Sequence, residues 1–533
     1  MQPQEQSVFS FSKILLAGVL TLVFLSVYTY FFPQQSQEVK QSSTSENLAP
    51  TTTLSQIQSP SKAQDDDLLL KVKAKDFELE IDVLGRIKQV YLKDKKFIAH
   101  PAESIFARLF GGGKKQKALT SLSLFDSSSI RPLEVRFADP ALNQKAFSTH
   151  YTTTKKELEM QDKSLVIELV QNLGDLVFKK KITLNPDLSY SITLESSDKN
   201  AQYFLTNGAR PVADSDQYVF LGSIISSKEG KLEKLKEGDA EGITEYKDSV
   251  FMASVDRYFA SVLYSKAQNL NVVVDGRIGA KNPITFADLK GDTTLEGYIG
   301  AKNYQELKAL YAPLGDVVEY GLITFFAKPL FLLLELLYDW VGNWGWAIVL
   351  LTLFVRLALF PLSYKGMMGM QKLKDIAPQM KELQTKYKND PQKLQKQMME
   401  LYRKSGANPL GGCLPLLLQI PVFFAIYKVL YCAVELKSAS WIFWIVDLSA
   451  IDPYYVLPLI MGITMYISQI LTPSNFTDPT QEKVFKLLPV FFTIFFIIFP
   501  FPAGLVLYWS VNNVISIFQQ LLINRIVEKQ KKV

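Results

Sequence analysis

The chain has 533 residues, of which 48% are hydrophobic, and it carries a formal net charge of +6. So small a net charge on so long a chain gives no sign of nucleic-acid binding, and none is expected. The cysteines, Cys413 and Cys432, lie at opposite ends of one apolar segment, about 28 Å apart if that segment is a helix. This separation excludes a disulfide between them, and no metal site or cofactor is expected.

The N-terminal region predicts a membrane anchor followed by a tether. A short cytoplasmic segment, 1–13, precedes the apolar run ILLAGVLTLVFLSVYTYFF at 14–32. This run is longer than the apolar region of a cleaved signal peptide and ends without a small-residue cleavage pattern, which favours an uncleaved signal anchor. Residues 33–67 are rich in Gln, Ser, Thr and Pro, and this composition predicts a disordered linker.

From residue 68 the hydrophobic pattern changes to the alternation that is typical of half-buried strands. In KDFELEIDVLG (75–85), apolar residues alternate with acidic ones. Similar runs, separated by turn sequences such as NLGD and NPDLS, occur at 165–170, 176–184, 190–194, 218–225, 258–264 and 271–274. Helical pattern returns only at 303–311. Residues 68–312 therefore predict one large, mostly antiparallel β-sandwich domain.

Residues 321–339 are apolar enough to be a candidate membrane span. However, Lys328-Pro329 is expected to break the helix, and Glu335 interrupts its second half. An amphipathic helix lying on the outer surface of the membrane is therefore favoured over a span.

Five further apolar stretches predict membrane spans, at 342–364, 410–432, 454–472, 487–501 and 504–523. The loop at 365–408 carries ten Lys or Arg against four Asp or Glu, so the positive-inside rule places it in the cytoplasm. The loop at 433–453 is expected outside, whereas 473–486 is expected to be a cytoplasmic loop and 524–533 a basic cytoplasmic tail. Together with the anchor, this predicts six spans with both termini inside.

The cytoplasmic loop at 365–408 returns to helical periodicity and predicts a helical hairpin. Asp390 followed by Pro391 is a typical helix start. Apolar residues, many of them Met, recur every three, four or seven positions: Met367, Met370, Leu373, Met380, Leu383, Tyr387, Leu394, Met398 and Leu401. This stripe either only holds the two helices together or also contacts membrane or client segments, because Met side chains adapt to varied surfaces.

Arg356 lies in the middle of the expected span at 342–364, roughly 13 to 18 Å from either edge. Its guanidinium cannot lose its proton, and a charge at mid-span costs ~3 kcal/mol on insertion scales. The expected spans contain no Asp or Glu that could neutralise it. The sequence therefore predicts an Arg that faces water inside the membrane and is free to meet a visiting partner.

Three stretches carry a resemblance to a known family: GWAIVLLTLFVRLALFPL, NPLGGCLPLLLQIPVFFAIYKVL and FPAGLVLYWSVNNVISIFQQLLINR. In these motifs and in the order of its parts the chain resembles the YidC/Oxa/Alb family of membrane protein insertases, in its Gram-negative bacterial form. The resemblance is most specific over 340–525. It implies a multi-pass protein of the bacterial inner membrane, with a five-helix insertase core and a large periplasmic all-β domain of the supersandwich type.

The resemblance also implies a site. A groove open to the cytoplasm and the lipid would have Arg356 at its base, with Thr352, Gln419, Tyr508 and Asn512 as further polar groove residues. Clients would slide along the third and fifth spans, near these positions: Ile420, Pro421, Phe492 and Phe496. No residue is expected to be catalytic.

The implied function is to insert and help fold inner-membrane proteins, alone or with the Sec translocon. The implied partners are nascent membrane proteins, the Sec translocon and membrane lipids, with at most a weak ribosome contact because the tail at 524–533 is only modestly basic. The sequence contains no nucleotide-binding GxxxxGK[ST] motif. A secondary transporter is the alternative, but the chain lacks the internal repeats and intramembrane acids that transporters usually have.

Overall fold

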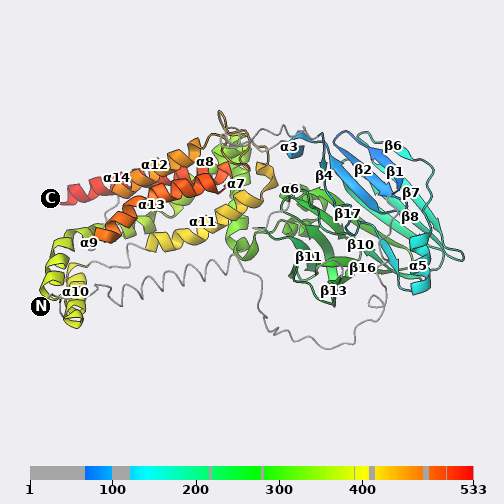
Figure 1. The fold of residues 1–533 in the computed structure, drawn as a ribbon, viewed down its shortest axis with the longest axis horizontal. Coiled ribbons are helices and arrows are strands. Elements are labelled where there is room, and N and C mark those ends of the chain that lie inside the picture. Colours follow the sequence, from blue (N-terminus) through cyan, green and yellow to red (C-terminus); the bar gives the residue numbers. More distant parts are fainter. Residues whose placement is uncertain are drawn as a thin grey trace, which may run out of the picture.

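The computed structural model describes residues 67–98, 120–214, 219–277, 281–388, 390–406, 414–471, 479–499 and 501–531. The expected anchor at 14–32 and almost all of the expected linker lie outside these ranges, as does Cys413. Figure 1 places the strands at one end of the long axis and the helices of the C-terminal half at the other.

The strands form two sheets. The smaller sheet has the order β4-β3-β2-β1-β6, and the larger follows β5-β10-β16-β15-β13-β14-β17-β9-β8-β7, with β11 paired to β13 and to β12. The strands are β1 (Leu68–Lys73), β2 (Phe77–Asp82), β3 (Ile87–Leu92), β4 (Leu122–Ser123), β5 (Val135–Phe137), β6 (Glu157–Glu159), β7 (Leu165–Asn172), β8 (Val177–Leu184), β9 (Ser189–Ser196), β10 (Gln202–Thr206), β11 (Gly222–Ser227), β12 (Leu232–Lys236), β13 (Ile243–Val255), β14 (Phe259–Tyr264), β15 (Leu270–Asp275), β16 (Ile284–Lys290) and β17 (Thr293–Ala301).

Each run of alternating residues expected from the sequence overlaps one of these strands. In β7, Ile167, Leu169 and Gln171 are buried, whereas Val166, Glu168 and Asn172 are exposed, as period-two alternation requires. The domain also contains α3 (Lys95–Ile98), α5 (Pro140–Ser148) and α6 (Tyr304–Leu310). The long strand β13 and the helix α5 were not expected from the sequence.

The C-terminal half is helical. Its helices are η1 (Ala312–Val317), η2 (Gly321–Ile323), α7 (Thr324–Val341), α8 (Trp344–Ala358), α9 (Phe360–Lys386), α10 (Pro391–Ser405), α11 (Leu414–Cys432), η3 (Val434–Leu436), α12 (Val456–Leu471), α13 (Pro479–Ile498) and α14 (Ala503–Lys531). In Figure 1, α10 and the bend into it lie at the end farthest from the strands.

Two expected helix breaks differ from the structure. Helix α7 continues through Pro329, where a break was expected. Pro329 stands near the N-terminus of α7, so it removes a single helical hydrogen bond there. Conversely, the expected span at 342–364 is not one helix, because the chain bends by 60° between α8 and α9. Pro361 explains this bend, since it has no amide hydrogen and its ring clashes with the preceding turn.

Two helices are longer than expected. Helix α13 begins at Pro479, inside the expected loop at 473–486. Helix α14 continues to Lys531, through most of the expected tail at 524–533. In both places the added residues are too polar to lengthen a span, but they are compatible with helix, so hydropathy alone did not reveal them.

The expected hairpin is present as α9 and α10. Fewer apolar residues pack between its two helices than the nine expected from the sequence. Ile376 and Met380 are buried against Leu373, Met398 and Leu401. The side chain of Asp390 caps α10 by accepting a hydrogen bond from the amide of Lys393, as the sequence predicts.

By length and composition, one described helix is long and apolar enough to cross a membrane, Ala503–Lys529, or two if the bent pair α8–α9 counts as one span. Three shorter apolar helices accompany it: Gln419–Cys432, Val456–Leu471 and Phe485–Ile498. The expected count of six spans therefore remains a prediction.

One apolar core joins the β domain to the helices. Phe251 and Val262 of the large sheet belong to the same buried cluster as Phe331 of α7, Leu351 of α8 and Val429 of α11. Polar contacts reinforce this junction: Arg257 donates from Nε to the carbonyl of Tyr431 at 3.0 Å, and Lys437 pairs with Asp214 at 2.9 Å. The junction lies near α7 in Figure 1.

Candidate functional site

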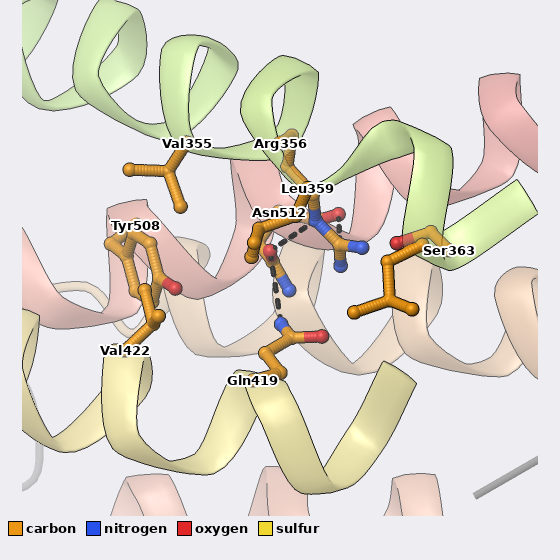
Figure 2. Close-up of a pocket in the computed structure, with 9 residues that line it drawn as sticks. Val355, Arg356, Leu359, Ser363, Gln419, Val422, Tyr508 and Asn512 are labelled. Carbon is orange, nitrogen blue, oxygen red and sulfur yellow. Dashed lines mark hydrogen bonds between the residues drawn. The ribbon is translucent and has the colours of Figure 1, made fainter. Parts of the chain in front are cut away.

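Arg356 lies in the last turn of α8, just before the bend at Leu359. The Nε atom of its guanidinium donates to Oδ1 of Asn512 at 2.6 Å, and a terminal nitrogen donates to Oγ of Ser516 at 2.6 Å. The same terminal nitrogen also lies 3.4 Å from the backbone carbonyl of Asn512. Arg356 is therefore bound to α14, as Figure 2 shows for its contact with Asn512.

The α14 residues of the site are spaced four apart. Tyr508, Asn512 and Ser516 occupy successive turns on one helix face, which faces α8. Tyr508 and Asn512 are buried, and the hydroxyl of Ser516 donates to the carbonyl of Asn512 at 2.8 Å. This bond turns the oxygen lone pairs of Ser516 toward the guanidinium.

Gln419 connects α11 to the same site. Its Nε2 donates to Oδ1 of Asn512 at 3.2 Å, so one amide oxygen accepts from both Gln419 and Arg356. These side chains surround a small pocket between α8, α9, α11 and α14 (Figure 2). The pocket is lined by Val355, Arg356, Leu359, Leu362, Ser363, Gln419, Val422, Tyr508 and Asn512.

The hydrogen-bond partners of Arg356 in the described part of the chain are all neutral. Amide and hydroxyl oxygens solvate the guanidinium, but they do not cancel its charge. The expectation of a free Arg therefore needs correction: Arg356 is bonded, yet it remains cationic. The sequence did not reveal these partners because pairing between helices more than 150 residues apart is not encoded in local spacing.

One expected groove residue lies elsewhere. Thr352 is buried and is not part of the pocket lining; its hydroxyl donates to the carbonyl of Ile348 on its own helix at 2.7 Å. Ser363, conversely, lines the pocket but was not among the expected groove residues. The spacing of four from Asn512 was a signal for Ser516, but Ser363 reaches the pocket only because the chain bends after α8.

The expected client-contact residues divide between two environments. On α11, Ile420 is 40% exposed, and Pro421 is half-buried. On α13, Phe496 is only 5% exposed and packs edge-on against Trp509, and half-buried Phe492 also contacts Trp509. The outward row of α13 is instead Leu487, Val490, Phe491, Ile494 and Ile498. Phe496 therefore does not lie on the exposed face of α13, and its contact with clients stays a prediction.

The site contains no recognisable catalytic machinery in the described residues. Its polar groups are a guanidinium, two amides and three hydroxyls. Within the described ranges, no group of three or more His, Cys, Asp or Glu could hold a metal ion. The arrangement can attract and hydrogen-bond an anionic or polar group, which is a binding role.

A β domain packed on an apolar helical bundle, with a hydrogen-bonded cationic Arg inside the bundle, is typical of a membrane protein with a large domain outside the lipid. Residues 336–531 match the family described as 60Kd inner membrane protein, and residues 70–333 match the YidC periplasmic domain. The chain belongs to the YidC family of membrane protein insertases.

Relatives agree over the whole chain. The membrane protein insertase YidC of Helicobacter pylori (strain ATCC 700392 / 26695) is 49% identical over 535 residues, covering 98% of this chain and 97% of that protein. The protein of the same name from Wolinella succinogenes is 49% identical over 533 residues, covering 98% and 96%. A structure described as "Active YidC insertase crystal structure with the first transmembrane domain resolved" aligns over 94% of this chain and 98% of that chain, at 19% identity and a TM-score of 0.37. That TM-score is too low to compare the arrangement of the parts.

Family membership establishes the broad function and place of the chain. It is a membrane insertase of the bacterial inner membrane with a periplasmic domain. The alternative of a secondary transporter has no support in these relatives.

Proposed function

We propose that this chain inserts client segments by attracting their translocated tails to Arg356, through a polar groove open to the cytoplasm and the lipid. The observation that carries the proposal is the charge of Arg356, which its partners Asn512 and Ser516 solvate without neutralising. A client tail with an acidic residue loses several kcal/mol of hydration per charge in hydrocarbon. A cation part-way across the membrane shortens the distance over which the acidic tail must cross hydrocarbon without water or an opposite charge.

The groove has its polar residues on four helices, α8, α9, α11 and α14. Arg356, Gln419, Tyr508 and Asn512 meet at the pocket, and Ser363 extends it along α9 toward the hairpin. The hairpin loop carries ten Lys or Arg against four acids, so α9 and α10 belong on the cytoplasmic side. An entering tail would therefore meet the pocket from the cytoplasm.

The proposal includes six spans, with the termini inside and residues 68–312 outside. Helices α11 and α12 have 19 and 16 residues, and the apolar part of α13, Phe485–Ile498, has 14. At 1.5 Å per residue, these lengths correspond to about 21 to 29 Å, against ~30 Å for the hydrocarbon core. The segment 321–339, which lies in η2 and α7, is proposed to lie at the outer surface, where the exposed Phe325 and Trp340 of α7 would contact lipid.

Clients are proposed to leave the groove between α11 and α13. Phe423 of α11 and Phe492 of α13 both contact Trp509 of α14, so aromatic contacts connect the two helices through α14. Ile420 and the outward row of α13 present apolar surface on these two helices. Burial of the client's own apolar segment in lipid, together with the membrane potential, would drive insertion.

The partners follow the same reasoning. Nascent membrane proteins are the clients, the Sec translocon is the proposed neighbour for larger ones, and lipids surround the exposed faces of α12 and α13. Direct ribosome contact through Arg525, Lys529, Lys531 and Lys532 would be weak, because four cations give only modest attraction. No cofactor takes part in this scheme.

Site-specific photocrosslinking to a ribosome-bound nascent membrane protein tests the proposal. Photoreactive residues at Ile420 and Phe491 should both crosslink to the client's apolar segment. Ile463 on α12 is the matched control, because it is equally apolar and 60% exposed but lies on a different helix. Equal crosslinking from Ile463 would mean that the client samples the whole bundle surface, and the proposed exit path would be wrong.

A further inference from the structure

Pro489 leaves one backbone carbonyl of α13 without its helical donor. A proline has no amide hydrogen, so the carbonyl of Phe485, four residues earlier, loses its usual partner. A backbone carbonyl that is packed between two helices is costly to leave without a hydrogen bond. Helix α13 nevertheless continues through Pro489 from Pro479 to Ile498.

A side chain from the neighbouring helix supplies the missing donor. Nε2 of Gln469, on α12, donates to the carbonyl of Phe485 at 2.5 Å. Because that carbonyl can only accept, the nitrogen end of the amide must face it. The other end of the amide, Oε1, is buried and has no hydrogen-bond partner among the described residues. The contact with α13 therefore fixes the orientation of Gln469.

A second close contact lies on the other side of Pro489. A Cβ atom on Gly462 of α12 would lie 1.9 Å from Oγ1 of Thr493, so only glycine lets the helices approach here. The hydroxyl of Thr493 donates to the carbonyl of Pro489 at 2.7 Å. The two contacts are seven residues apart on α12 and eight apart on α13, so α12 holds α13 on both sides of the proline.

We propose that Gln469 is a positioning residue for insertion: its amide replaces the donor that Pro489 removes and so holds the middle of α13 in place. The outward row Leu487, Val490, Phe491 and Ile494 surrounds Pro489 in sequence. Loss of the Gln469 donor would loosen the surface on which clients slide. The link to clients rests on the proposed function, whereas the link to Pro489 does not.

A double-mutant cycle in the purified full-length protein tests the coupling. Gln469→Met keeps the length of the side chain but removes its donor, and Pro489→Ala restores the helical donor to Phe485. Gln469→Met should lower the Tm by several degrees in the parent protein and far less in the Pro489→Ala background. Gln520→Met is the matched control: this amide donates to Asn524 on its own helix, so its effect should be equal in both backgrounds.

Equal effects of Gln469→Met in the two backgrounds, or no effect in either, would overturn the proposal. If the Gln469→Met protein does not accumulate in cells, the amount of protein in the membrane is measured instead of the Tm. Recovery of that amount when Pro489→Ala is added supports the coupling, and no recovery contradicts it.

Insertion is then measured separately. Gln469→Met should slow client insertion by about five-fold, the factor expected for one lost hydrogen bond, and Pro489→Ala should restore the rate. A Tm coupling without client crosslinks from Phe491 would leave the positioning role intact and contradict the proposed function instead. Crosslinks from Phe491 without Tm coupling would support the proposed function and contradict the positioning role of Gln469.

Discussion

Arg356 combines two properties. Its Nε and one terminal nitrogen donate hydrogen bonds to α14, and its positive charge is not cancelled by an acidic partner among these acceptors. Asn512 and Ser516 contribute oxygen dipoles at 2.6 Å, which stabilise the cation without an opposite charge. An acid at the same place would stabilise Arg356 more, but it would also remove the attraction for an acidic guest. The choice of neutral partners is therefore what a binding role requires.

Asn512→Asp separates these two effects. The new carboxylate would accept from Arg356 at the position of the present Oδ1, so we expect the Tm to stay level or rise. Insertion of a client with an acidic tail should fall by about ten-fold or more, because the cation is then neutralised. Thermal unfolding and insertion rates are measured on the same preparation. A large loss of Tm, or unchanged insertion of the acidic client, would contradict the role of the charge.

Glu435 offers a prediction about pH at the junction of the β domain and the bundle. Its carboxylate is buried and lies 3.4 Å from the amide of Tyr304, and burial raises the pKa of Glu435 to about 7. A carboxyl whose pKa is raised by folding contributes its stability at low pH, and this is lost as the pH rises from about 4.5 through 7. The wild type should therefore lose up to about 3 kcal/mol of stability across that window.

Glu435→Gln mimics the protonated form, so it should raise the Tm at pH 8 and leave the Tm at pH 4.5 unchanged. Unfolding scans of both proteins over this range measure the difference. A variant that is less stable than the wild type at pH 8 would mean that the carboxylate form is the one the junction favours.

At the scale of helices, some positions accept only glycine because a neighbouring segment packs directly against the helix backbone. Gly345 stands in the first turn of α8, and a Cβ atom there would lie 2.1 Å from the ring of Trp441 and 2.6 Å from its Cβ atom. Both contacts involve the rigid base of the Trp side chain. The glycine therefore lets the loop after α11 pack against the start of α8.

Gly345→Ala should consequently destabilise the protein, by about 1 to 3 kcal/mol, although alanine normally favours a helix. Gly504→Ala is the control, because glycine 504 has the same place in α14 and its nearest neighbour would be 3.2 Å from the new Cβ atom. Chemical or thermal unfolding should show a clearly larger loss for Gly345→Ala. The reverse order would mean that the Trp441 contact relaxes at little cost.

The sequence predicted the positions of the strands better than the limits and faces of the helices. Alternation locates strands directly, because only one face of each is buried. In FFTIFFII of α13, by contrast, every position except Thr493 is apolar, so periodicity cannot tell Phe496, which packs on Trp509, from Phe491, which faces outward. The acceptors of Arg356 come from a helix distant in sequence, and only the fold brings them together.

At the scale of the whole molecule, the β domain and the bundle share a core, yet the Arg356 pocket is built from helices alone. Its lining comes from α8, α9, α11 and α14, together with Leu359 between α8 and α9. The contacts Arg257 to Tyr431 and Asp214 to Lys437 lie at the junction instead. Stability and insertion should therefore depend on the β domain to different degrees.

Deletion of 70–300 should lower the Tm of the remaining protein but leave insertion of a simple client within about three-fold of the wild type, since the site itself is unchanged. Lys437→Met is the companion variant, because it removes one junction contact while keeping the domain. Loss of insertion by a deletion protein that accumulates normally in the membrane would mean that the β domain acts on clients directly.

The most direct test of the central claim compares one client carrying an acidic, a neutral or a basic translocated tail in the wild type, Arg356→Ala and Arg356→Lys proteins. A charge pair at about 4 Å in a medium of intermediate dielectric is worth up to roughly 4 kcal/mol before desolvation. Arg356→Ala should therefore slow the acidic client by about ten- to a hundred-fold and the other two much less, whereas Arg356→Lys should retain most of the activity. Equal losses for all three tails in the Arg356→Ala protein would contradict charge attraction at this site.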